Sequence, residues 1–276
     1  MNVAIIGCGY VGSAVARYWS KTLGLTVTAT TTTPARVESL KAIANRVIVV
    51  QGNDAEGLKS VLQGQNTVLL SVGAKGRDPQ LYQEAYQKTA QTLAKILPQV
   101  PEVQHLIYTG SYGLYGDQNG VIVDETSPVF PSSKNQEILY KTEQILQELN
   151  SENLKTCILR LGGIYGPNRE VVKNLRRIFG TTRPGNGRYP TAWVHLDDIV
   201  GVIEFVRQKR LEGIYNVADN SNLILRQMLD TLSEKYDLPR VTWDVSQPNS
   251  RPYNIRVSNQ KLKDAGYQFI HPETIL

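Results

Sequence analysis

Cysteine and histidine are scarce in this sequence of 276 residues. The two cysteines, Cys8 and Cys157, lie far apart in apolar stretches, so a disulfide framework is excluded and a reducing compartment is expected. The three histidines are spread along the chain, and we therefore expect no zinc site and no other metal site.

Long apolar runs are also missing. No stretch reaches the roughly 18 apolar residues of a membrane-spanning helix, and the N-terminus lacks the basic region and apolar run of a signal peptide. We expect a cytoplasmic protein with no membrane partner. Its 41% hydrophobic and 20% charged residues are ordinary for a globular chain of one or two domains.

The net charge of +5 is modest, but the positive excess is local. Between residues 169 and 188 only Glu170 opposes six basic residues, which are Arg169, Lys173, Arg176, Arg177, Arg183 and Arg188. No helix-turn-helix, zinc finger or aromatic-basic strand accompanies them, so no nucleic-acid partner is expected. A solvated basic face and a site for an anionic small molecule remain as the two interpretations.

Short apolar runs alternate with amphipathic segments over the first 160 residues. Strands are predicted near residues 3–6, 25–30, 46–50, 67–72, 105–109 and 156–160, with long helices near 79–97 and 132–150. This alternation predicts an α/β fold with a doubly wound parallel sheet.

A glycine-rich loop, Gly7 to Gly12, follows the first predicted strand and opens a helix. In that context Gly7 permits the tight turn, Gly9 lets the backbone approach a pyrophosphate, and Gly12 allows close packing of helix on strand. The backbone of Tyr10 and Val11 would complete a phosphate site at the helix N-terminus. The loop predicts a dinucleotide-binding site.

The end of the second predicted strand carries threonines where NAD-binding folds place a carboxylate for the ribose 2′-hydroxyl. The first acidic residue of the chain is Glu38, whereas Thr31, Thr32 and Arg36 can bind a 2′-phosphate. NADP is therefore favoured over NAD. Further cofactor contacts are expected after the third and fourth strands, from Asn53, Ser71, Val72 and Gly73.

Five segments in order resemble the extended short-chain dehydrogenase/reductase superfamily, and within it the NAD-dependent epimerase/dehydratase group, which acts on nucleotide sugars. They are Gly7 to Gly12, Ser111 to Gly116, Arg160 to Pro167, Val194 to Asp198 and Tyr215 to Ala218. The resemblance implies a Rossmann domain at 1–166, to which 191–211 return, and a small interleaved C-terminal α/β substrate domain made of 167–190 and 212–276.

The family's reaction uses a Ser, a Tyr that acts as acid and base, and a Lys four residues after the Tyr. Ser111 occupies the serine position. With Glu143-Gln144 as the anchor of the comparison, Asn135 and Leu139 occupy the tyrosine and lysine positions. The chain thus resembles an atypical branch that lacks the Tyr-x-x-x-Lys pair.

The adjacent Tyr140 and Lys141 point about 100° apart on a helix and cannot replace that pair. Tyr115 is the substitute acid that the sequence offers. Resemblance and charge together indicate an NAD(P)-binding oxidoreductase or epimerase, monomeric or homodimeric, for an anionic, nucleotide-linked substrate. The expected substrate contacts are Tyr165, Arg169, Arg188 and His195. The alternative is a non-catalytic dinucleotide-binding sensor or regulatory subunit.

Overall fold

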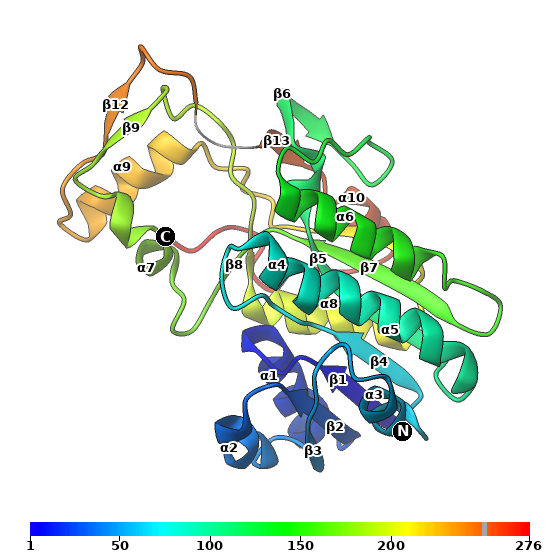
Figure 1. Ribbon diagram of the computed structural model, residues 1–276. Helices are drawn as coiled ribbons and strands as arrows, with labels where there is room; N and C mark the ends of the chain where they lie inside the picture. Colours follow the sequence, from blue (N-terminus) through cyan, green and yellow to red (C-terminus); the bar gives the residue numbers. More distant parts are fainter. Residues whose placement is uncertain (250–252) are drawn as a thin grey trace. The chain divides into compact units, whose positions relative to one another are not determined.

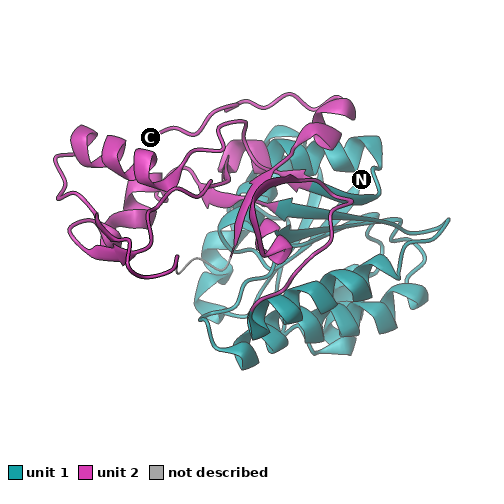
Figure 2. Ribbon diagram, turned by 90° about the horizontal axis from the view of Figure 1, so that it is seen from above, with its two compact units in different colours: residues 1–111, 133–160, 200–215 teal, residues 112–132, 161–199, 216–276 magenta. Residues whose placement is uncertain are grey.

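The computed structural model describes residues 1–249 and 253–276 (Figure 1). The chain forms two compact units, each assembled from three segments (Figure 2). The first unit consists of Met1–Ser111, Ser133–Arg160 and Val200–Tyr215, and the second of Tyr112–Ser132, Leu161–Ile199 and Asn216–Leu276.

These bounds differ from those expected from the sequence. Residues 112–132, 161–166 and 191–199 fall in the second unit, and 212–215 fall in the first. Strand pairing accounts for most of the difference, because the segment at 117–123 pairs with 254–257 and the segment at 163–165 pairs with 193–195.

A seven-stranded sheet has the order β11-β7-β5-β4-β1-β2-β3, with neighbouring strands parallel. This confirms the doubly wound α/β fold that the sequence predicts. The order reverses between β1 and β4, which is where such sheets leave a crevice at the carboxyl ends of their strands. The strands are β1 (Asn2–Ile6), β2 (Thr26–Thr31), β3 (Arg46–Val49), β4 (Thr67–Leu70), β5 (His105–Ser111), β7 (Lys155–Leu161) and β11 (Gly213–Val217).

Most helices of the first unit bury apolar residues against the sheet or a neighbouring helix, whereas the short helix Pro79–Tyr82 has no buried residue. They are α1 (Tyr10–Arg17), α2 (Val37–Lys41), α3 (Ala55–Leu62), α4 (Pro79–Tyr82), α5 (Thr89–Ile96) and α6 (Lys134–Gln147), while α8 (Leu196–Lys209) begins in the second unit. The predicted helix 79–97 is helical throughout, but a π-helical segment, Gln83–Lys88, separates α4 from α5. Helix α5 packs between α3 and α6 (Figure 1).

The core of the first unit is continuous. Trp19 follows α1 in the sequence and is fully buried. Its indole N–H donates to the Glu204 carboxylate on α8 at 2.8 Å and so links two segments that are distant in sequence. The apolar side chains of β1, β4 and β5 join those of α3 and α5 in one cluster, which includes Ile6, Leu58, Leu70, Leu93 and Leu106. This rigid core fixes the strand ends that carry the site.

The second unit consists of strand pairs and short helices. Its pairs are β8 (Gly163–Tyr165) with β10 (Trp193–His195), β9 (Thr182–Pro184) with β12 (Thr242–Asp244), and β6 (Asp117–Val123) with β13 (Asn254–Val257). Its helices are α7 (Val171–Leu175), α9 (Leu225–Lys235) and α10 (Gln260–Asp264). Over the residues that the structure describes, no helix combines the length and apolarity that crossing a membrane requires.

Candidate functional site

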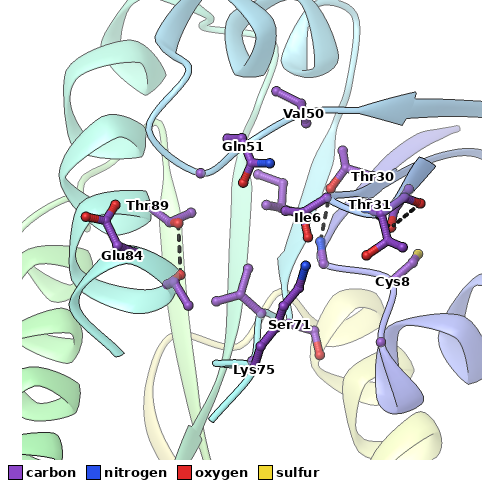
Figure 3. A pocket seen from close by; sticks show the side chains of 18 of the residues that line it. Ile6, Cys8, Thr30, Thr31, Val50, Gln51, Ser71, Lys75, Glu84 and Thr89 are labelled. Atoms are coloured by element: carbon purple, nitrogen blue, oxygen red, sulfur yellow. Dashed lines mark hydrogen bonds between the residues drawn. The ribbon is translucent and has the colours of Figure 1, made fainter. Parts of the chain in front are cut away.

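A cavity of about 380 Å³ opens in the first unit at the carboxyl ends of β1, β2 and β4 (Figure 3). Nine of the twelve residues that the sequence analysis assigned to cofactor binding line it. They are Gly7, Gly9, Thr31, Thr32, Arg36, Asn53, Ser71, Val72 and Gly73. The other three, Tyr10, Val11 and Gly12, form the first turn of α1 and lie outside the lining residues.

The three glycines of the loop are required for different reasons. Gly7 has φ +92°, and a Cβ there would lie 2.6 Å from the Ser71 carbonyl oxygen. A Cβ on Gly12 would lie 2.5 Å from the Gly7 carbonyl oxygen, so this glycine lets α1 start directly against β1. A Cβ on Gly9 would meet no heavy atom of the described residues within 4 Å. Gly9 therefore borders open space, whereas Gly7 and Gly12 serve the packing of the loop itself.

Hydrogen bonds donated by backbone amides hold the loop to two neighbouring strands. The Gly7 amide donates to the Thr30 hydroxyl at 3.0 Å, and the Cys8 amide donates to the Thr30 carbonyl at 3.0 Å. On the other side the Ser71 amide donates to the Ile6 carbonyl at 2.8 Å. Thr30 is thus the anchor of the loop, a role that the sequence analysis did not assign to it.

Helix α1 begins at Tyr10 with Gly9 as its N-cap. No side chain of the described residues caps this end, and the first turn carries no acidic residue. The amide groups at a helix start lack intrahelical partners and carry the positive end of the helix dipole. This end of α1 is therefore suited to an anion.

The predicted ribose-binding residues differ in their availability. The Thr31 hydroxyl accepts from the Thr33 amide at 3.1 Å and is buried, so it is occupied within its own turn. Thr32 is exposed at the cavity. The Arg36 guanidinium donates to the Cys8 carbonyl and, at 3.2 Å, to the Ser13 hydroxyl. Arg36 is thereby held against the glycine loop instead of extending into solvent.

Several lining residues were missed by sequence reasoning. Lys75, in the segment after β4, extends into the cavity, and Gln51 follows β3 (Figure 3). Glu84 is the one acidic residue among the described lining residues, and it is paired with Lys88. Burial raises the pKa of the Cys8 thiol to about 12, so this cysteine is not a nucleophile. In the sequence, the only indication that Lys75 and Gln51 line the cavity is that each lies shortly after a predicted strand.

Ser111 ends β5 and therefore lies at the same sheet edge as the glycine loop, although it is not a lining residue of the cavity. On α6, the Asn135 amide donates to the Arg77 carbonyl at 2.8 Å. Glu143, two turns later, is buried and pairs with Arg160 of β7 at 2.8 Å. Glu143 thus contacts the sheet, whereas Asn135 contacts the loop before α4, and Leu139, between them in sequence, is half-buried.

The remaining site residues lie in the second unit. Tyr115 is fully buried and donates to the Asn216 side-chain oxygen at 2.9 Å. Tyr165 is buried, and its hydroxyl accepts from the Ile275 amide at 3.2 Å. Burial raises the pKa of Tyr165 to about 12. Both phenols are therefore part of the unit's interior, which argues against Tyr115 as a substitute acid.

The basic candidates and His195 are placed differently. Arg169 and Arg188 are exposed on separate loops. His195 ends β10 and packs its ring against Tyr165 with centroids 5.1 Å apart. Burial and the neighbouring His271 lower the pKa of His195. The structure thus groups Tyr165 with His195 and does not join either arginine to them through a described contact.

The sheet order, the crevice position and the glycine loop define a Rossmann-type α/β protein. The pattern of the NAD dependent epimerase/dehydratase family matches residues 3–218, most of the chain. The chain belongs to the NAD-dependent epimerase/dehydratase family. None of the curated proteins matches it in sequence.

Solved structures with the same fold cover nearly the whole chain. UDP-glucose 4-epimerase of Thermus thermophilus, in complex with NAD, has a TM-score of 0.80 at 23% identity over 98% of this chain and 94% of that one. UDP-glucose 4-epimerase of Thermotoga maritima, with UDP-glucose, has a TM-score of 0.80 at 21% identity over 98% and 94%. A conserved protein of unknown function from Silicibacter pomeroyi has a TM-score of 0.78 at 24% identity over 99% and 95%.

Proposed function

We propose that the cavity of the first unit binds a nicotinamide dinucleotide, with its pyrophosphate over Gly9 and the N-terminal end of α1. The observation that carries this proposal is the contrast among the three glycines. Gly7 and Gly12 have no room for a side chain, whereas Gly9 faces open space at the cavity. A backbone surface of this kind lets phosphate oxygens approach amide groups directly.

The preferred cofactor in this proposal is NADP, although the similar Thermus epimerase is a complex with NAD. Arg36 and Thr32 line the cavity at the end of β2, and the threonine run supplies no carboxylate to repel a 2′-phosphate. The two bonds to Cys8 and Ser13 leave guanidinium donors of Arg36 for such a phosphate. When bound, the cofactor supplies a hydride acceptor or donor, and the residues of this chain orient it.

Titration with NADPH and NADH tests the preference, with calorimetry as the readout. The wild type is expected to bind NADPH at least about tenfold more tightly, since one charge-assisted phosphate contact contributes about 1.5–3 kcal/mol. Arg36→Ala should remove most of this difference and leave NADH affinity nearly unchanged. Arg17→Ala, which removes an exposed charge of α1, is the matched control. Tighter binding of NADH by the wild type would refute the preference.

The proposed substrate is an anionic, nucleotide-linked molecule. The similar Thermotoga epimerase contains UDP-glucose, and the exposed arginines Arg169 and Arg188 offer guanidinium groups for phosphates in the second unit. Tyr165 and His195 form a ring pair within the same unit. In an enzyme of this kind Ser111 would hydrogen-bond the reacting oxygen.

The sequence of α6 favours a second candidate, a non-catalytic dinucleotide-binding protein. Asn135 and Leu139 precede the buried Glu143 by about two turns and one turn, and the comparison anchored at Glu143 puts them in the tyrosine and lysine positions. Neither side chain can transfer a proton near pH 7. Loss of the general acid typically costs about 10²–10⁴ in rate.

One assay separates the two candidates. NADPH-dependent conversion of UDP-glucose is followed by nicotinamide absorbance and by analysis of the sugar product. Turnover that falls in Ser111→Ala and persists in Tyr140→Phe and Lys141→Ala would support an enzyme with a displaced acid. Loss of turnover in Tyr140→Phe would show that Tyr140 is the acid after all. Tight NADPH binding without turnover of any UDP-sugar would support the non-catalytic role.

A further inference from the structure

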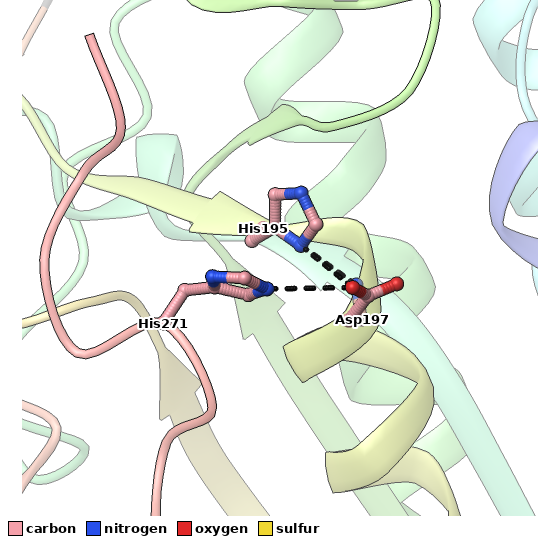
Figure 4. Close-up of side chains that lie close together, drawn as sticks. All are labelled: His195, Asp197 and His271. Atoms are coloured by element: carbon pink, nitrogen blue, oxygen red, sulfur yellow. Dashed lines mark hydrogen bonds and ion pairs between the residues drawn. The ribbon is translucent and has the colours of Figure 1, made fainter.

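Two histidines that are far apart in the sequence meet at one carboxylate in the second unit (Figure 4). His195 ends β10, Asp197 lies in the first turn of α8, and His271 follows α10. The Asp197 Oδ2 atom lies 3.4 Å from His195 Nδ1 and 3.3 Å from His271 Nε2. The two rings lie with centroids 3.9 Å apart.

These separations are long for charge-assisted hydrogen bonds, which have N···O distances of about 2.7–2.9 Å. They fit a different arrangement. In a tetrahedral site with metal–ligand bonds of about 2.0–2.1 Å, neighbouring ligand atoms are about 3.3–3.4 Å apart. All three potential ligand atoms lie within 4.8 Å of one another, so a single ion can contact each of them after small side-chain rotations.

The backbone around the cluster is fixed by a neighbouring carboxylate. Asp198 is fully buried and accepts from the Ile270 amide at 2.7 Å and from the His271 amide at 2.9 Å. Tyr267 donates to the same carboxylate at 3.2 Å. These bonds bring the segment that carries His271 to the start of α8. The histidine is therefore positioned without a contribution from its own ring.

We propose that His195, Asp197 and His271 form a binding site for a divalent transition metal of the zinc class. Two imidazoles and one carboxylate suit zinc, whereas calcium and magnesium prefer sites made of oxygen. The Asp197 side chain is 57% exposed, so water can take the fourth position. The site lies in the second unit and does not depend on the proposed dinucleotide cavity.

One hydrogen bond must break when the metal binds. The Asp197 amide lies 3.2 Å from His195 Nδ1 and donates to it, which leaves the other nitrogen of that ring to carry the proton. The contact is long, and a metal–nitrogen bond replaces it. The negative charge of Asp197 favours the ion, whereas the buried Asp198 is already satisfied by backbone amides.

The test measures zinc binding by the full chain after treatment with a chelator and desalting. Competition with a chromophoric chelator gives the stoichiometry and affinity, and the visible spectrum of the Co²⁺-loaded protein reports four-coordinate geometry. The wild type is expected to bind one equivalent of Zn²⁺ and to give the intense Co²⁺ absorption of a tetrahedral site. Asp197→Ala and His271→Ala should each weaken binding by more than about 100-fold, beyond the usual cost of losing a supporting residue.

Asp117→Asn is the matched control, because it removes an exposed carboxylate of the same unit and retains an acceptor for the Asn119 amide. Circular dichroism checks that each variant is folded. Since Asp197 is largely exposed, its replacement tests the site even if His271→Ala proves unstable. No zinc uptake by the wild type, an octahedral Co²⁺ spectrum, or unchanged affinity in Asp197→Ala would overturn the proposal.

Discussion

Replacement of Gly9 by valine should separate ligand binding from folding. A Cβ at this position meets none of the described heavy atoms within 4 Å. The φ of −77° is ordinary, but the ψ of −144° lies outside the α and β regions that L-residues favour, so valine adds backbone strain of about 1–3 kcal/mol. Valine is also a poorer N-cap than glycine, which costs up to about 1 kcal/mol. The protein should therefore still fold, with a lower free energy of unfolding than wild type.

The same side chain would occupy the space proposed for the pyrophosphate. Loss of one charge-assisted hydrogen bond between an amide and a phosphate oxygen costs about 1.5–3 kcal/mol. The dissociation constant for NADPH should thus rise by about 10- to 150-fold, and more if the pyrophosphate is displaced altogether. Calorimetric titration measures this change, and urea denaturation of the same sample measures the stability.

Gly12→Ala is the matched partner, because it adds a methyl group to the same loop at a position that does not line the cavity. Its Cβ would lie 2.5 Å from the Gly7 carbonyl oxygen and 3.2 Å from Ile5 Cγ2, so overpacking should cost about 1–3 kcal/mol of stability. A folded Gly9→Val protein with wild-type affinity for NADPH would remove the loop from the binding site. An unchanged free energy of unfolding in Gly12→Ala would refute the packing argument.

Two further predictions concern pH. Burial raises the pKa of Asp219 to about 6, so the folded state holds its proton more tightly than the unfolded state, and this contribution to stability is lost as the pH rises from about 4 to about 6. In urea titrations, the free energy of unfolding of Asp219→Asn relative to wild type should therefore be about 1 kcal/mol higher at pH 7.5 than at pH 5. An equal difference at both pH values would contradict the pKa shift. Burial lowers the pKa of His105 from 6.5 to about 4, so the unfolded state takes up a proton first and stability falls as the pH drops below about 6.5. The variant His105→Gln can still donate to the Leu211 carbonyl. Between pH 7.5 and pH 5 its free energy of unfolding should fall by about 2 kcal/mol less than that of wild type. An unaltered dependence of stability on pH would show that another group causes the fall.

The central sheet could be predicted because its strands depend on local information. The residues of β4, for example, are buried on both faces, and such a strand appears in the sequence as an unbroken apolar run bounded by turn residues. The edge strand β11 was missed as a strand, since Gly213–Val217 mixes glycine and asparagine with only three apolar or aromatic residues. Its place is determined by pairing with a distant strand and not by its composition.

The candidate site was predictable where it depends on backbone and missed where it depends on tertiary contacts. The glycine loop requires small residues at fixed spacing, so the pattern reveals it. The run Thr30 to Thr33 gave no indication that Thr30 anchors the loop while Thr31 bonds within its own turn. Nor could spacing show that His271 meets His195, because backbone bonds to Asp198 bring that segment into place. The expectation that the histidines are too scattered for a metal site was based on sequence distance alone.

Because the segments of the two units alternate along the chain, they also determine which parts of the protein can fold first during translation. Strand β11 belongs to the sheet of the first unit, so the chain must be synthesised as far as residue 217 before that sheet can be complete. The partner of strand β6 is synthesised even later, because β6 pairs with β13 at residues 254–257. A pairing across such a separation carries a high entropic cost and folds slowly. The nascent chain therefore presents β6 as an unpaired strand until residues 254–257 are synthesised, and Val121 and Ile122 stay exposed even after β6 is paired. Neither unit corresponds to a continuous stretch of the gene, and no single proteolytic cut or simple truncation can release one of them intact.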